Sequence, residues 1–438
     1  MFSSLKKLFG NAADGAAPPL VASLPDEAAP SPFLRREAIF GRDNRIAGHL
    51  FSVHQSSVLA DGKPQTQRDL DRILLDTLNA SPEAWNRSPA VLPLSSASLD
   101  SPALARLKGD NVTLLLQLAA DAEADLVCES IDQLRQRGLR FGLFRQPSHP
   151  AYAKVIQKVD FAAIDVANSE ADAIRNFSAA VRAGVSANPI HLFACNVDTV
   201  DDHQFCLQWH FDLCHGKFGE RAGVAANAPC GDPHKTQLLN LLHLVQGDAE
   251  TAEIAAAMRL DPVLSFRILR YLNSPALALT HRIESLDQAL IILGRQRLTR
   301  WLAVLLFSVR EPQLNDWLLV ENALTRGRLM EVLGTQLLPG QPHDPLFLTG
   351  IFSCLDRLLR RPLAEVLGTM PIADEIRLAL LERQGPYAPL LAVAEASEAV
   401  DQAVMAKLAQ AAGVDPDRLN RALLAATAWA SEVTEYWE

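Results

Sequence analysis

Segments typical of strands and of helices alternate through the first half of the chain, and this order limits the folds that it can adopt. Short apolar runs predict strands at 37–40, 45–53, 89–94, 112–118, 139–144, 160–166, 189–195 and 211–214. The longer segments between them predict helices at 67–78, 122–137, 170–183 and 201–209. Such alternation indicates a parallel sheet, and roughly seven or eight repeats over about 190 residues predict a small (β/α) barrel.

The second half of the chain is predicted to be all helical. The alternation stops at 222–233, a stretch of Ala, Asn, Gly and Pro, where we place a domain boundary. Ser285 and Gln288 form a capping box before a helix at 289–293 that Gly294 ends. Further helices are predicted at 263–272, 298–309, 322–338, 346–359, 372–382, 399–412 and 417–434. The expected units are a flexible leader at 1–32, a barrel at 33–221 and a helical domain at 234–438.

Composition restricts the classes of function. The 438-residue chain has a net charge of −10. This charge argues against general nucleic-acid binding, which needs a basic surface to release counterions. The N-terminus lacks the apolar core of a secretory signal, no apolar stretch is long enough to span a membrane, and the 6 cysteines include no CxxC pair. The sequence therefore predicts a cytoplasmic protein with reduced thiols.

Residues 1–9, MFSSLKKLF, place apolar side chains at helical spacing opposite Lys6 and Lys7. Such a segment could make weak contact with a membrane surface or a partner. About two helical turns are too few for strong binding, so a frayed terminus ahead of the leader is the favoured interpretation.

The most specific motif lies at 252–302 and reads AEIAAAMRLDPVLSFRILRYLNSPALALTHRIESLDQALIILGRQRLTRWL. Its run DPVLSFRILRYLNSP and the spacing to IESLDQALIILG resemble an HDOD domain, the all-helical relative of HD-type phosphohydrolases. The N-terminal half resembles an EAL domain, the barrel that hydrolyses cyclic di-GMP. This order is that of EAL-HDOD signalling proteins, so the resemblance implies an EAL-like (β/α) barrel followed by an all-helical HDOD domain.

The EAL resemblance implies a metal site, and the positions that should form it are replaced. Hydrolysis in EAL domains uses divalent cations, which need carboxylates converging from the C-terminal ends of barrel strands. His49 stands where the glutamate of the naming motif is expected, Pro93 replaces an asparagine, and Gln117 replaces a second glutamate. Phe144 and Arg145 replace the paired aspartates, and a guanidinium at that place would repel a metal ion.

The later strands continue this pattern. In the Lys-Ile-Asp motif Ala163 replaces the lysine, and only Asp165 remains. In FACNVDT Asn196 stands for the expected glutamate and Asp198 for a second acidic position, while His215 replaces the closing glutamine. Losing one such group commonly costs orders of magnitude in rate. We therefore expect a degenerate EAL domain that is not an enzyme and has no cofactor.

The helical half is also predicted to lack its metal site. An HD phosphohydrolase places a His-Asp pair inside an apolar helix to hold metals. The matching helix reads LFLTGIFSCLDRLL, with Ser353 and Cys354 at the place of that pair. The resemblance therefore implies degenerate HD positions and no metal.

Two further clusters offer alternative sites. His203, Cys206 and His210 have helical spacing that could suit a soft metal, with Cys214 just beyond. Because that helix should end near Trp209, ordinary packing is the favoured interpretation. Basic residues in the HDOD run could line a groove for an acidic partner or nucleotide, although solvated or paired side chains are favoured. This candidate binding groove comprises Arg267, Arg270, Arg295, Arg297 and Arg300.

Three functions stay open at this point. The favoured one is a non-catalytic signal-transduction adaptor that acts through protein partners, in pathways that the resemblance links to cyclic di-GMP. The second is a degenerate receptor that binds cyclic di-GMP without cutting it, with Arg145 near a phosphate. The third, an active cyclic di-GMP phosphodiesterase, is disfavoured by Phe144, Arg145, Gln117 and Asn196. EAL domains often dimerise, so the resemblance also implies a homodimer.

Overall fold

The structure, a computed structural model, describes residues 33–53, 64–218 and 233–435. Short gaps inside these ranges fall at 83, 86–87, 108–110, 185–188, 248, 262–263, 266–267, 269–284, 308–313, 341–342, 369 and 399–400. The predicted leader and most of the predicted helix at 263–272 lie outside the described residues. Within the described ranges, no helix combines the length and apolar character needed to cross a membrane.

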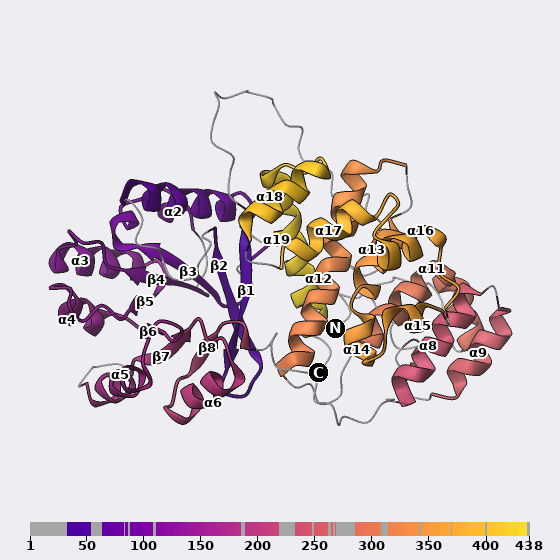
Figure 1. Ribbon diagram of the computed structural model, residues 1–438, viewed down its shortest axis with the longest axis horizontal. Coiled ribbons are helices and arrows are strands. Elements are labelled where there is room, and N and C mark those ends of the chain that lie inside the picture. The colour runs from indigo at the N-terminus through magenta and orange to yellow at the C-terminus, as the bar shows by residue number, and fades with distance from the viewer. Residues whose placement is uncertain are drawn as a thin grey trace.

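Eight strands close into a barrel whose order around the ring follows the chain (Figure 1). They are β1 (Arg35–Gly41), β2 (Ile46–Ser52), β3 (Ala90–Ser95), β4 (Val112–Gln117), β5 (Arg140–Phe144), β6 (Phe161–Asp165), β7 (His191–Cys195) and β8 (Leu213–His215). Strands β2 to β8 are parallel, whereas β1 is antiparallel to both β2 and β8. The sequence predicted each strand but not the reversed direction of β1.

Helices follow the parallel strands and cover the outside of the barrel (Figure 1). The longer ones are α2 (Pro64–Asn79), α3 (Ala124–Arg135), α5 (Ala171–Ala183) and α6 (Val200–Gln208), with a short α4 (Tyr152–Val155). Thr199 begins α6 because its hydroxyl accepts the Asp202 N–H at 3.1 Å. The (β/α) barrel predicted from the alternation is therefore confirmed.

The second half is all helical. Its elements are α8 (Pro233–Gln246), α9 (Thr251–Arg259), α11 (Leu286–Leu306), α12 (Leu314–Leu337), α13 (Asp344–Phe352), α14 (Leu355–Leu359), α15 (Leu363–Gly368), α16 (Asp374–Arg377), a π-helical turn η6 (Leu378–Glu382), α17 (Ala388–Ala396), α18 (Gln402–Ala411) and α19 (Pro416–Glu435). Ser285 caps α11 by accepting the Gln288 N–H at 3.2 Å, as predicted. Gly294, with φ of 73°, interrupts that helix. The predicted helix at 346–359 is divided at Ser353 and Cys354 into α13 and α14.

Two glycines let α12 and α13 cross closely. A Cβ added to Gly350 would lie 2.5 Å from the Cα of Gly327, which is closer than real Cβ contacts allow. A Cβ added to Gly327 would likewise meet the side chains of Ile351 and Phe347 of α13 at 2.8 and 3.2 Å, and both are fully buried. The crossing therefore anchors the core of the helical domain.

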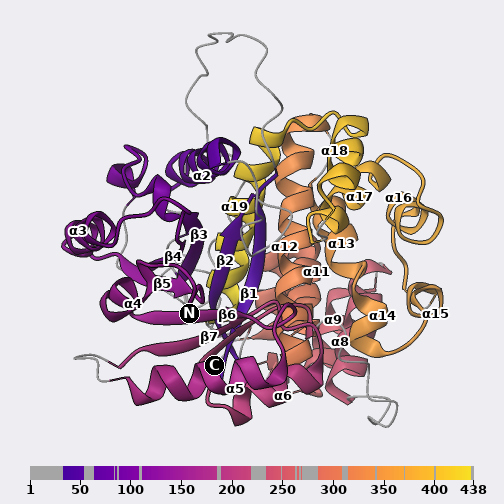
Figure 2. The ribbon, with the colours of Figure 1, turned by 60° about the vertical axis from the view of Figure 1, so that its left-hand side comes forward.

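The barrel and the helical domain pack together through β1 and β2, which lie beside α12 and α19 in both views (Figures 1 and 2). The Leu34 N–H donates a buried hydrogen bond of 2.8 Å to Oδ1 of Asn420 in α19. Phe33 packs into the core of the helical domain, and Leu424 of α19 packs into a cluster of the barrel. Each domain thus contributes side chains to the other's core.

Candidate functional site

An apolar cluster fills the centre of the barrel. Its members are Ile39, Leu50, Val91, Leu115, Phe144, Ala163, Phe193 and Cys195, with Leu213 packed against them. Because every strand contributes to this cluster, its members face the barrel axis. Side chains alternate along a strand, so the cluster also fixes which other residues face inward.

The prediction that His49 occupies the glutamate position inside the barrel is wrong. Its neighbour Leu50 belongs to the central cluster, so His49 points outward toward α12. A similar shift of one residue applies in β7. Cys195 faces the barrel centre, whereas Asn196 follows the strand with a left-handed φ of 56°. The interior positions of β2 and β7 therefore carry Leu50 and Cys195. These side chains suit a magnesium site even less than the predicted His49 and Asn196 would, because hard cations need oxygen ligands.

The structure gathers most of the other predicted positions at the mouth of the barrel, where the parallel strands end. By alternation, Pro93, Gln117, Asp165 and His215 face inward there, next to Phe144 and Ala163 of the central cluster. Arg145 lies one residue beyond β5 and is exposed, so it does not fill the mouth as predicted. Asp198 lies in the loop after β7 and is half-buried.

Sequence reasoning missed Glu37, which faces the same mouth from the antiparallel strand β1. Its carboxylate accepts a hydrogen bond from Arg35 at 2.8 Å and lies 3.5 Å from Nε2 of His215. Burial alone would raise the pKa of Glu37, but the charges of His215 and Arg35 outweigh it and lower the pKa to about 2. This carboxylate is therefore already paired with the Arg35 guanidinium.

Some polar atoms at the mouth have no hydrogen-bond partner among the described residues. They include Oε1 of Gln117, Oδ1 of Asp165 and Oγ of Ser52. The other Asp165 oxygen accepts a hydrogen bond of 2.8 Å from Asn168. Buried polar atoms normally have partners, so the mouth keeps capacity to bind a polar group. In the described part of the chain, however, no three His, Cys, Asp or Glu side chains gather closely enough to hold a metal ion.

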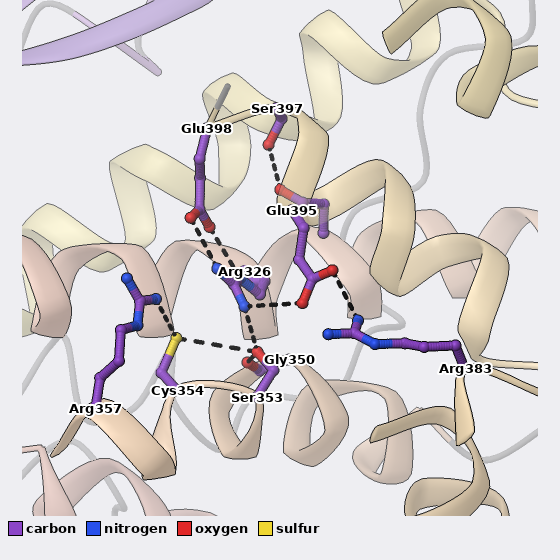
Figure 3. Close-up of polar contacts among 10 residues, drawn as sticks. Arg326, Gly350, Ser353, Cys354, Arg357, Arg383, Glu395, Ser397 and Glu398 are labelled. Atoms are coloured by element: carbon purple, nitrogen blue, oxygen red, sulfur yellow. Dashed lines mark hydrogen bonds and ion pairs between the residues drawn. The ribbon is translucent and has the colours of Figure 1, made fainter. Parts of the chain in front are cut away.

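The predicted HD positions, Ser353 and Cys354, lie beside the buried side chain of Arg326. This arginine forms a cluster with Ser353, Glu395 and Glu398 (Figure 3). Nε and Nη2 of Arg326 donate to the two oxygens of Glu398 at 2.9 and 2.8 Å, a bidentate pair. Nη1 of Arg326 donates to the Ser353 hydroxyl at 2.6 Å and approaches Glu395 at 3.4 Å. A guanidinium thus holds the carboxylates nearest the place where an HD enzyme would hold a metal cation.

The thiol of Cys354 takes part in the same region. Arg357 donates to its sulfur at 3.2 Å (Figure 3). The Cys354 side chain is fully buried. Burial raises the pKa of Cys354 despite the nearby Arg326 charge, so the thiol stays protonated and is a poor metal ligand. The carboxylates of the cluster come from α17 and the residues just after it, which no HD-type motif would reveal.

The predicted arginine groove is not formed by the described residues. Arg300 is buried, pairs with Glu331 at 2.6 and 2.8 Å, and stacks over the Phe347 ring at 3.8 Å. Arg295 donates to the carbonyl oxygens of Val245 and Ala249. Only Arg297 is exposed without such a contact, and Arg267 and Arg270 lie outside the described residues.

The candidate soft-metal cluster also consists of packed and surface side chains. His203 and Cys206 are buried on α6, and the His203 ring stacks on Phe218 with centroids 4.2 Å apart. His210 lies beyond the helix and is exposed, and Cys214 packs on β8 behind Phe40 and Phe218. These positions agree with ordinary packing.

A second buried charged cluster, which we call the interdomain cluster, joins Arg36 of β1, His49 of β2 and Glu321 of α12. Nε2 of His49 lies 2.8 Å from both Nη2 of Arg36 and Oε1 of Glu321, and Arg36 pairs directly with Glu321. Burial and the Arg36 charge lower the pKa of His49. Burial would raise the pKa of Glu321, but Arg36 and His49 outweigh it and lower the pKa to about 2. His49 therefore serves the domain contact and not the barrel mouth.

Comparison with known proteins agrees with this architecture. Residues 235–362 match the HDOD domain family. The chain is 24% identical over 313 residues to the cyclic di-GMP phosphodiesterase CdgJ of Vibrio cholerae, covering 70% of this chain and 71% of that protein. It is 28% identical over 197 residues to the uncharacterized protein YuxH of Bacillus subtilis, covering 44% of this chain and 48% of YuxH.

Among solved structures, the EAL enzyme Bd1971 in its cGMP-bound form aligns with a TM-score of 0.32 and 12% identity, over 42% of this chain and 59% of that one. The chain is thus an EAL-like barrel followed by an HDOD domain, as predicted, and it is related to cyclic di-GMP phosphodiesterases.

Proposed function

We propose that this protein is a non-catalytic signalling adaptor that acts by binding other proteins in a pathway linked to cyclic di-GMP. The observation that carries the proposal is the chemistry of the inward positions. Leu50, Phe144 and Cys195 occupy the barrel mouth where carboxylates would have to converge on metal ions. A barrel with these residues cannot supply the anionic cage that two-metal hydrolysis of a phosphodiester needs.

The helical domain supports the same proposal. Its nearest equivalent to a metal cation is the Arg326 guanidinium, which pairs with Glu398 and lies near Glu395. An arginine cannot activate water as a metal ion does, so this cluster stabilises the fold and supplies no hydrolytic chemistry. The similarity to CdgJ supports a link to cyclic di-GMP signalling, and a cytoplasmic location and a homodimer remain part of the proposal.

A second candidate, a receptor that binds cyclic di-GMP without cutting it, is favoured by the unpartnered polar atoms of Gln117 and Asp165. These acceptors face a mouth that also carries the Arg35 guanidinium and the His215 imidazole. Guanine amino groups and phosphate oxygens would find complementary partners there. The apolar residues at Leu50 and Phe144 reduce the polar surface available for such a ligand.

Calorimetry of the full chain with cyclic di-GMP, with and without Mn²⁺, separates these functions when the linear product is measured in the same samples. The adaptor predicts neither heat nor product. Heat without product supports the receptor if Asp165→Asn abolishes it and the matched exposed variant Asp201→Asn does not. Linear product that requires Mn²⁺ would overturn both proposals and assign the protein as a phosphodiesterase.

A further inference from the structure

A cavity of about 270 Å³ lies at the end of the barrel opposite the mouth. Its inner wall is apolar and includes Ile39, Val91 and Phe193, which are almost fully buried. Its rim carries Thr113, Arg140, Phe161, His191 and Asp212. The strand register places Thr113 beside Arg140 and Phe161 beside His191, so these four side chains come from consecutive strands.

Arg140 is the unusual member of this rim. Its Nε is buried and has no hydrogen-bond acceptor among the described residues, and its guanidinium carries no ion pair with any of them. Its contact within the cavity wall is the Phe161 ring, whose centroid lies 5.9 Å from the guanidinium carbon. A buried donor of this kind normally has a partner, because leaving it unpaired costs free energy.

The acidic groups nearby are already engaged. Asp160 holds Arg135 through two hydrogen bonds of 2.9 and 3.0 Å. Asp212 accepts the Leu192 N–H at 2.9 Å and lies 3.5 Å from Nδ1 of His191. Among the residues that the structure describes, Arg140 on this rim therefore has no carboxylate partner for its positive charge.

We propose that this cavity binds a small carboxylic acid with an aromatic or short aliphatic body. Its volume lies just below the usual range of ligand pockets, which suits a small ligand. The guanidinium of Arg140 offers paired donors that match a carboxylate, and the apolar wall would receive the body of the ligand. The site is independent of cyclic di-GMP, because it lies at the other end of the barrel from Gln117 and Asp165.

Calorimetry of the full chain with phenylacetate, and with phenylacetamide as its uncharged counterpart, tests the proposal without any variant. We expect phenylacetate to bind and phenylacetamide to bind at least about tenfold more weakly, a difference of about 1.4 kcal/mol. Equal affinity for the two compounds, or no binding of phenylacetate in the millimolar range, would overturn the proposal.

Variants then locate the site. Arg140→Met keeps the apolar stem and should weaken phenylacetate binding by about tenfold or more, while Arg140→Lys should retain part of it. The matched control is Arg145→Met, which removes an exposed guanidinium at the opposite end of the same strand and should leave binding unchanged. If Arg145→Met weakens binding as much as Arg140→Met does, the carboxylate binds elsewhere and the assignment is wrong.

Discussion

Replacing Glu321 by glutamine should weaken the contact between the barrel and the helical domain. The side chains of Arg36 and Glu321 are 9% and 8% exposed, so their charges are held almost entirely by each other and by His49. Glu321→Gln leaves the Arg36 guanidinium buried without a carboxylate partner in the described chain. Removing one member of a buried ion pair typically costs about 3–5 kcal/mol.

Urea unfolding followed by tryptophan fluorescence measures this cost, because Trp317 lines the same cleft between the domains as Glu321. With an m-value of about 3 kcal/mol/M, the midpoint should fall by roughly 1 M or more. The control is Glu365→Gln, which removes the same charge from an exposed pair with Arg361 and should cost less than about 1 kcal/mol. The double variant Arg36→Met/Glu321→Leu should recover much of the loss, since no unpaired charge remains.

A Glu321→Gln midpoint no lower than that of Glu365→Gln would refute this reasoning. It would mean that water reaches Arg36 once the carboxylate is gone, and that the interdomain cluster contributes little to the docking of the two domains.

Three further predictions rest on single features of the structure. First, the pKa of His49 is lowered in the folded state, so the unfolded chain takes up the proton first and stability should fall as pH drops below about 6.5. In urea titrations at several pH values, His49→Gln should reduce the dependence of the unfolding free energy on pH. An unchanged dependence would contradict this prediction. Second, Gly350→Ala should lower the free energy of unfolding by about 1–3 kcal/mol because the new Cβ would clash with Gly327. Gly368→Ala, which has open space around it, should leave thermal unfolding unchanged. Equal effects of the two variants would contradict this prediction. Third, Arg326→Lys should lower the unfolding temperature nearly as much as Arg326→Met, since lysine cannot form the bidentate pair with Glu398; full rescue by lysine would count against that pair.

The sequence located every strand of the barrel but not which residues of β2 and β7 face inward. In β2 the last five residues are all buried, because the barrel interior covers one face and the helical domain covers the other. The alternation of apolar and polar residues that would distinguish His49 from Leu50 is therefore absent. The antiparallel direction of β1 could not be predicted either, because the sequence of a strand does not determine whether its neighbours run parallel or antiparallel to it.

The charged clusters could not be predicted from their own segments. Arg300 appears basic within its helix, yet its partner Glu331 lies 31 residues away along the chain. Glu321 sits in the apolar run LLVENAL, and its partners Arg36 and His49 come from the other domain. A buried carboxylate in an apolar helix was the available signal, because such a group is seldom fully buried without a partner.

Binding of Mn²⁺ to crystals of the full chain tests the central claim most directly, since anomalous scattering locates the ion without an assay of activity. We predict no ordered ion between Gln117 and Asp165 at the barrel mouth, and none between Glu395 and Glu398 while Arg326 holds them. A well-occupied manganese ion at either place would contradict the proposal that neither the barrel mouth nor the Arg326 cluster binds a catalytic metal ion.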